Sequence, residues 1–232
     1  MESGQRKRIV LFGDSITQGS FSSEHRGWGG RLSEWLCRYV DVLNRGFSGY
    51  NSRWALSILP SILGGVGSAS LAVVFFGAND SVQAGESQHV PLEEYDQNLR
   101  SIIDIFKEQN PDIALILVTP PPVDHTRWPS RHNELVSTYA EAVRRIAVDK
   151  AAVLVDLWIT ADAIAINDLE DGLHLNESGN SKVFFAVQRG IREAWPHLAS
   201  CCSVPMQYPD WKLLQGQAIE ESIQIVKDWK WN

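Results

Sequence analysis

A serine and a histidine that lie far apart in the sequence are the residues best suited to acyl-transfer chemistry. Ser15 follows four apolar residues, 9–12, which predict a buried strand, and Gly13 allows a sharp turn behind them. His174 lies three residues after Asp171. Within one turn, this spacing lets the carboxylate reach Nδ1–H of the imidazole while Nε2 faces a serine. The residue types therefore predict a nucleophile, a base and a group that orients the base.

These side chains can meet only if the fold brings them to one edge of a sheet. Strand and helix patterns alternate along the chain, with connections of crossover length. The predicted strands are residues 9–12, 41–45, 71–76, 113–118 and 152–155. This pattern predicts an α/β fold, a three-layer α/β/α sandwich around a flavodoxin-like five-stranded parallel sheet of order 2-1-3-4-5, with a C-terminal tail. In this order, ligands bind beside the carboxyl end of the first strand, where Ser15 lies.

Amphipathic helices are predicted between the strands. Apolar residues recur at helical spacing over residues 28–39, 53–63, 92–106, 135–146 and 183–191. Ser52 is expected to cap the second of these helices, and Asn176 is expected to cap the last. A further short helix is expected from about Trp158 to Ile166.

Composition argues against several classes of protein. The 21 basic and 28 acidic residues give a net charge of −7, which disfavours binding to nucleic acid or to anionic lipid. No apolar run is long enough for a membrane span, and residues 1–8 lack the apolar region of a secretory signal. The three cysteines, Cys37, Cys201 and Cys202, are typical of a reduced, cytoplasmic protein. The histidines other than His174 lack zinc-ligand spacing, so we expect no metal site.

The pattern changes near Pro196. We therefore expect one hydrolase domain over residues 1–196 and a C-terminal extension over residues 197–232. The extension contains Trp211, Trp229 and Trp231, and a segment this aromatic is expected to be covered. Two arrangements stay open: packing on the chain's own core, or packing on a partner subunit in a homodimer.

Four short motifs, in the order of the strands, resemble those of the GDSL, or SGNH, family of serine esterases and lipases. They are Gly-Asp-Ser-Ile at 13–16, Asn-Arg-Gly-Phe-Ser-Gly at 44–49, Gly-Ala-Asn-Asp at 77–80 and Asp-Gly-Leu-His at 171–174. The fourth residue of the first motif is isoleucine where the family name has leucine. The resemblance covers residues 8–195. Within the family, the compact length and the Gly-Tyr-Asn-Ser-Arg at 49–53 are most similar to the isoamyl acetate-hydrolysing esterases.

The resemblance implies a role for each motif residue. Ser15 would be the nucleophile, His174 the general base and then the general acid, and Asp171 its orienting carboxylate. The oxyanion would be held by the backbone N–H groups of Ser15 and Gly49 and by the side-chain amide of Asn79. The implied activity is hydrolysis of small, short-acyl, acetate-like carboxylic esters through an acyl-enzyme on Ser15, without metal or cofactor.

Other interpretations stay open on the sequence. Trp128, in the loop after the fourth strand, is expected to contact the acyl or alcohol group of the substrate. A thioesterase or an acyltransferase would use the same triad with a different substrate or acyl acceptor. A noncatalytic module that binds an acyl or sugar ligand is a further alternative, although the intact set of Ser15, Asn79, Asp171 and His174 argues against it. No G-x-S-x-G motif occurs, which argues against the ordinary α/β-hydrolase fold.

Overall fold

A central parallel sheet organises the fold. The structure, a computed structural model, describes residues 7–196, so the predicted extension at 197–232 lies outside the described residues. The strands are β1 (Arg8–Gly13), β2 (Asp41–Gly46), β3 (Leu71–Phe75), β4 (Ala114–Val118) and β5 (Val153–Val155). They form one five-stranded sheet in the order β2-β1-β3-β4-β5, with every pair parallel. The predicted strand order is confirmed.

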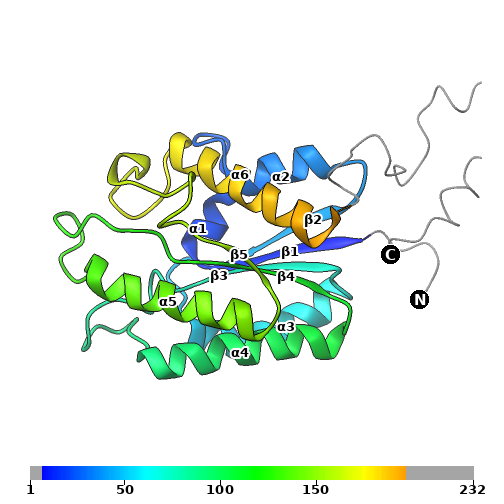
Figure 1. The fold of residues 1–232 in the computed structure, drawn as a ribbon, viewed down its shortest axis with the longest axis horizontal. Helices are drawn as coiled ribbons and strands as arrows, with labels where there is room; N and C mark the ends of the chain where they lie inside the picture. The colour runs from blue at the N-terminus through cyan, green and yellow to red at the C-terminus, as the bar shows by residue number, and fades with distance from the viewer. Residues whose placement is uncertain (1–6, 197–232) are drawn as a thin grey trace, which may run out of the picture.

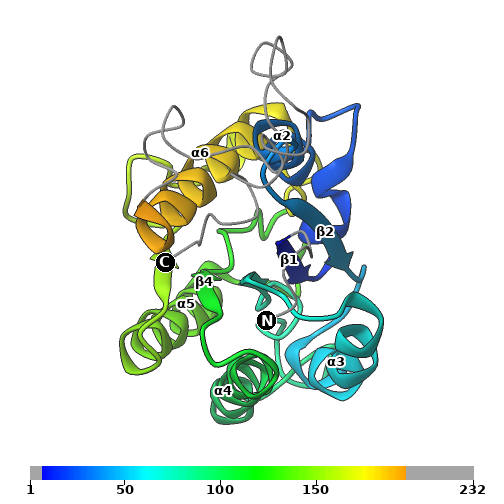
Figure 2. The ribbon, with the colours of Figure 1, turned by 90° about the vertical axis from the view of Figure 1, so that its right-hand side faces the viewer.

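Helices cover both faces of this sheet (Figures 1 and 2). One face carries α2 (Trp28–Leu36) and α6 (Glu177–Ala194). The other carries α3 (Ser52–Val66), α4 (Leu92–Gln109) and α5 (Asn133–Asp149). Three short helical segments lie in the connections, namely α1 (Ser15–Gln18), η1 (Gly19–Phe21) and η2 (Ile166–Asp168). The predicted three-layer α/β/α sandwich is therefore confirmed.

Strand β1 is buried on both faces because helices pack against each face of the sheet, and its two edges pair with β2 and β3. Its side chains alternate between the two hydrophobic layers, as the two-residue period of a strand requires. Ile9 and Leu11 pack in the layer that also contains Trp28, whereas Val10 and Phe12 pack in the layer of α3 and α4. Burying an apolar side chain of this size contributes about 1.5–3 kcal/mol. This burial anchors the strand that leads directly into Ser15.

The predicted helix cap is confirmed for α6 but not for α3. Asn176 caps α6 as predicted, because its Oδ1 accepts the Gly179 N–H at 3.1 Å. The prediction for α3 is wrong by one residue. Asn51 is the cap, accepting the Trp54 N–H at 3.0 Å, and Ser52 is the first helical residue. Both residue types cap helices well, so the sequence could not decide between two adjacent candidates.

The predicted short helix at Trp158–Ile166 is wrong. This segment forms turns and bends, with only η2 at its end. Long-range hydrogen bonds account for the difference. The Trp158 indole N–H donates to the Pro120 carbonyl at 2.7 Å, and the Ile164 N–H donates to the Leu157 carbonyl at 2.9 Å. A bond across seven residues cannot belong to a helical ladder, which joins residues four apart.

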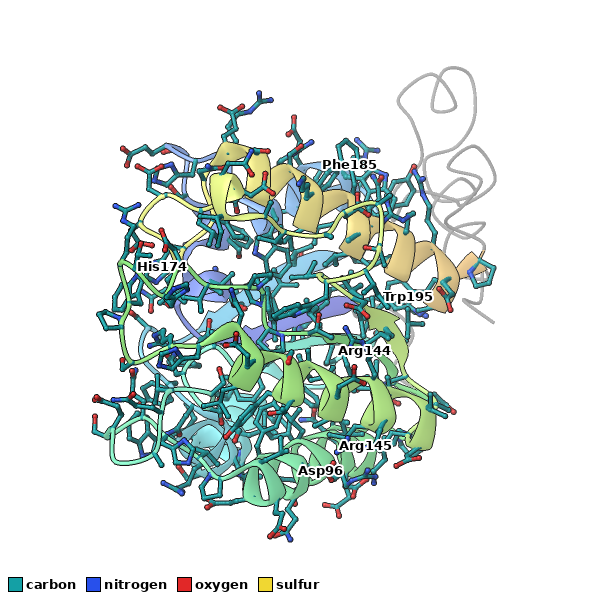
Figure 3. The ribbon with its side chains drawn as sticks, turned by 60° about the vertical axis from the view of Figure 1, so that its left-hand side comes forward. Asp96, Arg144, Arg145, His174, Phe185 and Trp195 are labelled. Carbon is teal, nitrogen blue, oxygen red and sulfur yellow. The ribbon has the colours of Figure 1, made fainter. Side chains whose placement is uncertain are left out.

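The carboxyl edge of the sheet collects the residues singled out in the sequence. Ser15 follows β1, Gly49 lies in the loop after β2, and Asn79 follows β3. Trp128 lies in the loop after β4, and residues 171–174 lie in the connection from β5 to α6. Figure 3 shows His174 among these loops, at the end of the sheet away from Trp195.

A glycine in β2 permits the close approach of the first turn. A Cβ built on Gly46 would lie 2.0 Å from the Gln18 backbone N and 2.5 Å from Gln18 Cα. Because these are backbone atoms, Gly46→Ala should lower the free energy of unfolding by more than about 2 kcal/mol in urea titrations. Gly64→Ala is the matched control in α3, where a Cβ meets nothing within 4 Å. It should stabilise the chain by about 0.5–1 kcal/mol, and equal effects of the two substitutions would contradict this account.

Candidate active site

Ser15 is held at a tight strand-to-helix junction. It is the first residue of α1, and the Asp14 side chain caps that helix by accepting the Ile16 N–H at 2.9 Å. The Ser15 N–H lies in the first turn, where a helix offers no acceptor for its amide groups. Only glycine fits at Gly13, because a Cβ there would lie 2.5 Å from the Phe75 carbonyl oxygen. The junction thus presents the half-buried Ser15 with an amide available for a ligand oxygen.

Three side chains form a continuous line of hydrogen bonds. His174 Nε2 lies 2.9 Å from Ser15 Oγ, and His174 Nδ1 lies 2.7 Å from Asp171 Oδ2. The other carboxylate oxygen of Asp171 accepts the N–H groups of Leu173 and His174, at 2.9 and 2.8 Å. Because Nδ1–H donates to the carboxylate, Nε2 is left to accept the serine proton. This arrangement can activate a hydroxyl for attack on a carbonyl carbon.

The carboxylate of Asp171 is stabilised in its ionised form. Partial burial acts to raise its pKa, but the hydrogen bonds from the His174 N–H, the His174 imidazole and the Leu173 N–H outweigh burial. The net pKa therefore lies below the ordinary value for an aspartate. An ionised Asp171 at neutral pH fixes the imidazole tautomer and stabilises the imidazolium that forms during proton transfer.

A buried aspartate fixes the segment that carries these two residues. Asp168 is 2% exposed and accepts the ammonium of Lys182 at 2.6 Å and the Ser178 hydroxyl at 2.7 Å. Its backbone carbonyl accepts the Asn176 N–H at 3.0 Å. Lys182 and Ser178 belong to α6, so the bonds tie the loop to that helix. The position of His174 is thereby set by the helix that follows it.

Trp128 also holds the loop that carries Asp171 and His174. Its indole N–H donates to the Asp171 carbonyl at 3.0 Å, and the nearby Asp124 N–H donates to the Gly172 carbonyl at 2.8 Å. Trp128 is half-buried. The sequence did not indicate this contact, which is a link between two loops 43 residues apart. The predicted contact of Trp128 with a substrate stays a prediction.

Asn79 and Gly49 lie on neighbouring, hydrogen-bonded loops. Asn79 is 3% exposed, and its Nδ2 donates to the Tyr50 carbonyl at 2.9 Å. Gly49 has a φ of +79°, a left-handed conformation that favours glycine. Its carbonyl accepts the side-chain N–H of Gln88 at 2.8 Å. The loops after β2 and β3 are therefore joined next to both predicted oxyanion donors.

Arg131 is a residue of this region that sequence reasoning missed. It is 4% exposed, and its guanidinium donates to the Ala78 carbonyl, to Asn79 Oδ1 and to Gln88 Oε1. No local pattern in the sequence distinguishes it from a surface arginine. Its burial follows from the pairing of two loops, for which the antiparallel bridge between Val82 and Arg131 is the backbone connection.

Two buried carboxylates lie beside the candidate site. Burial raises the pKa of Asp14 to about 7 and the pKa of Asp80 to about 6. Each is also affected by hydrogen bonding: Asp14 accepts the Ile16 N–H, and Asp80 accepts the Ser52 N–H at 2.8 Å. The negative charge of Asp80 raises the pKa of Asp14 further, while the positive charge of Arg131 lowers it.

Within residues 7–196, no group of three or more histidine, cysteine, aspartate or glutamate side chains is arranged to hold a metal ion. In the same part of the chain, no helix combines the length and the apolar character that crossing a membrane requires.

Comparison with known proteins gives consistent similarities. The model of the GDSL-like lipase/acylhydrolase family matches residues 11–182. The chain is 41% identical to isoamyl acetate-hydrolyzing esterase 1 homolog from Bos taurus, over 88% of this chain and 87% of that protein. It is 41% identical to GDSL esterase/lipase At5g45920 from Arabidopsis thaliana, over 81% of this chain and 87% of that protein. The crystal structure of the lipase/acylhydrolase from Enterococcus faecalis superimposes with a TM-score of 0.67 at 24% identity, covering 81% of this chain and 96% of that chain.

The buried Asp14 should make stability depend on pH in a specific direction. Since its pKa is raised from 3.8 to about 7, the folded chain keeps a proton that the unfolded chain releases between about pH 4 and pH 7. The folded state then binds more protons, so this group lowers the free energy of unfolding as pH rises through that window. Asp14→Asn removes the titration and keeps an acceptor for the Ile16 N–H. The stability of Asp14→Asn relative to wild type should therefore increase by up to about 1 kcal/mol per pH unit.

Urea titrations at several pH values from 4 to 7.5 measure this difference, in which the carboxylates that do not interact with Asp14 cancel. Asp112→Asn, at an exposed position, is the control for replacing an aspartate by asparagine. A difference between Asp14→Asn and wild type that stays constant with pH would contradict the assignment of a raised pKa.

Proposed function

Because the chain belongs to the GDSL-like lipase/acylhydrolase family and is a carboxylic-ester hydrolase, we propose that Ser15, His174 and Asp171 are its catalytic residues. We also propose short-acyl, acetate-like esters as its substrates. The observation that carries the proposal is the 2.9 Å contact between His174 Nε2 and Ser15 Oγ. The contact supplies the base that a serine needs, in the orientation that Asp171 fixes.

In the first half of the proposed reaction, Ser15 becomes acylated. Its hydroxyl gives a proton to His174 Nε2 while Oγ attacks the carbonyl carbon of the ester. The tetrahedral oxyanion accepts hydrogen bonds from the N–H groups of Ser15 and Gly49 and from the Asn79 amide. The imidazolium then protonates the leaving oxygen, the alcohol departs, and the acyl group stays on Ser15.

In the second half, water replaces the alcohol. His174 takes a proton from the water as the water oxygen attacks the acyl carbon. The second tetrahedral oxyanion accepts hydrogen bonds from the same three donors. When the intermediate collapses, the bond between the acyl carbon and Ser15 Oγ breaks. The proton returns from His174 to the serine oxygen, and the carboxylic acid is released. The cycle needs no metal or cofactor.

The choice of substrate rests on the relatives and on the apolar surface near the candidate site. The Bos taurus and Rattus norvegicus relatives are named isoamyl acetate-hydrolyzing esterase 1 homologs, and each is 41% identical to this chain. Phe47, Tyr50 and Trp54 form a row beside Gly49, with ring centroids 5.3 and 6.0 Å apart. Such a row offers an apolar surface to the alcohol part of an ester. Trp128 is proposed to contact substrate through its ring, since its N–H already donates to Asp171.

Further expectations stay proposals. We propose a cytoplasmic location from the use of cysteine, and a small-molecule ester rather than nucleic acid as the partner from the net charge of −7. A homodimer through residues 197–232 is proposed from the aromatic character of that segment alone.

A panel of p-nitrophenyl esters of graded acyl length tests the proposal. The wild type should hydrolyse the acetate at least about tenfold faster, in kcat/KM, than the octanoate, because the proposed short-acyl specificity requires a site that excludes added methylenes. Ser15→Ala should lower kcat on the acetate by at least about 10⁴-fold, because it removes the nucleophile. Ser23→Ala, at an exposed serine in the same region, is the matched control and should retain wild-type rates.

The two outcomes test separate parts of the proposal. Undiminished activity in Ser15→Ala would overturn the assignment of the nucleophile. Equal rates on acetate and octanoate would overturn the short-acyl preference and leave the assignment of Ser15 intact.

A further inference from the structure

Arg131 is a buried cation that no step of the proposed reaction uses. It lies one residue before the cap of α5, in the connection from β4. A buried charge is costly unless it is paired or hydrogen-bonded. Its backbone is fixed by the bridge to Val82 and by the bond from its N–H to the Trp128 carbonyl at 2.9 Å.

The guanidinium reaches three residues of the loop that connects β3 to α4. Nη1 donates to the Ala78 carbonyl. Nη2 donates to Asn79 Oδ1 at 3.0 Å and to Gln88 Oε1 at 3.2 Å. The guanidinium carbon lies 5.5 Å from the centre of the Trp128 ring, the same ring whose N–H donates to Asp171. Arg131 therefore contacts Asn79, a proposed oxyanion donor, and also Trp128, which is bonded to the loop of Asp171 and His174.

The chemistry of these partners fixes the orientation of the Asn79 amide. A guanidinium has donors and no acceptor, so the atom of Asn79 that faces Arg131 must be Oδ1. The NH₂ group then faces the other way, where one N–H donates to the Tyr50 carbonyl at 2.9 Å. The second N–H is left for the substrate oxygen. Without Arg131, the Tyr50 carbonyl alone would hold the amide, by a single bond about which it can rotate.

The same argument applies to Gln88 and extends to the loop of Gly49. Gln88 Oε1 faces the guanidinium, so its Nε2 must point away, and it donates to the Gly49 carbonyl at 2.8 Å. Gln88 thus connects Arg131 to the segment that carries Gly49. One guanidinium sets the geometry of two loops, each of which supplies a proposed oxyanion donor.

We propose that Arg131 is the positioning residue of the oxyanion hole, acting through Asn79 and Gln88 without touching the substrate. This inference rests on the proposed roles of Asn79 and Gly49. Both half-reactions pass through an oxyanion, so loss of Arg131 slows whichever step limits turnover. Substrate binding in the ground state depends less on these donors, so kcat falls more than KM rises.

Arg131→Lys separates geometry from charge. Lysine keeps the positive charge but replaces the planar fork by a single flexible ammonium, which cannot hold the same set of acceptors. On p-nitrophenyl acetate, we expect Arg131→Lys to lower kcat by about 10- to 100-fold, with KM changed by less than about threefold. Asn79→Ala should lower kcat by about 10²–10³-fold. The double variant should be slower than Asn79→Ala by no more than the 3- to 10-fold expected for the link through Gln88 to Gly49, and so by less than the product of the two single losses, because the route through Asn79 is already absent.

Two further variants keep the test decisive. Arg144→Lys is the matched control, since that guanidinium pairs with Asp156 and lies well away from His174 (Figure 3). The melting temperature of Arg144→Lys is expected to fall, because the substitution weakens the pair with Asp156, while its kcat should stay at the wild-type value. Gln88→Ala removes the link to Gly49 at a half-buried position, which the fold tolerates more easily than a change at Arg131. It should lower kcat about 3- to 10-fold with little change in KM.

The outcomes separate this inference from the proposed function. A wild-type kcat in Asn79→Ala would overturn the proposed oxyanion role and, with it, the inference. If Asn79→Ala is slow, multiplicative losses in the double variant, or a wild-type kcat in Arg131→Lys, would overturn the inference alone. Should Arg131→Lys not fold, Gln88→Ala decides: a wild-type kcat would overturn the positioning role, and a selective loss of kcat would support it.

Discussion

The hydrogen bond between His174 and Ser15 joins residues 159 positions apart, and the rest of the structure serves to make it. Ser15 comes from the end of a strand buried on both faces, whereas His174 comes from the loop before the last described helix. The parallel sheet brings them together because every strand delivers its following loop to the same edge. Burial of β1 fixes the position of one partner, and the bonds from Asp168 to α6 fix the position of the other.

Hydrogen bonds between the loops at the carboxyl edge of the sheet fix the positions of the residues that the strands bring together. Trp128 joins the loop after β4 to the Asp171 carbonyl. Arg131, in the same loop, joins it to Asn79 and Gln88 in the loop after β3. Gln88 in turn ties this region to Gly49. These loops are thus fixed to one another before any substrate binds. If the proposed oxyanion donors act as inferred, they need no reorganisation as charge develops, because these contacts already hold them in place.

The features that local sequence determines could be predicted. Apolar strands, alternating helices and Asn176 as a cap follow from periodicity and residue type, and the parallel pairing of the strands follows from connections of crossover length. The pairing of Asp171 with His174 follows from their three-residue spacing, and the structure contains the bond. What could not be predicted depends on contacts between distant segments. Arg131 has no local signal, because its burial results from the packing of two loops.

The two errors in prediction have different origins. The helix expected at Trp158–Ile166 is replaced by turns because the Trp158 indole binds a carbonyl 38 residues away. Asn51 caps α3 in place of Ser52, whose N–H is instead bonded to the buried Asp80. At Trp158–Ile166 a long-range polar contact outweighs a local preference, whereas at the start of α3 the sequence offers two equally suitable adjacent caps.

Covalent labelling by a fluorophosphonate tests whether His174 activates Ser15, because the reagent reacts with a serine that a base activates. The intact mass of the labelled chain and a peptide map would locate the adduct. The account predicts one adduct, on Ser15, in the wild type, and at least about 100-fold slower labelling in His174→Ala. An adduct on another serine, or labelling of Ser15 at an undiminished rate in His174→Ala, would contradict it.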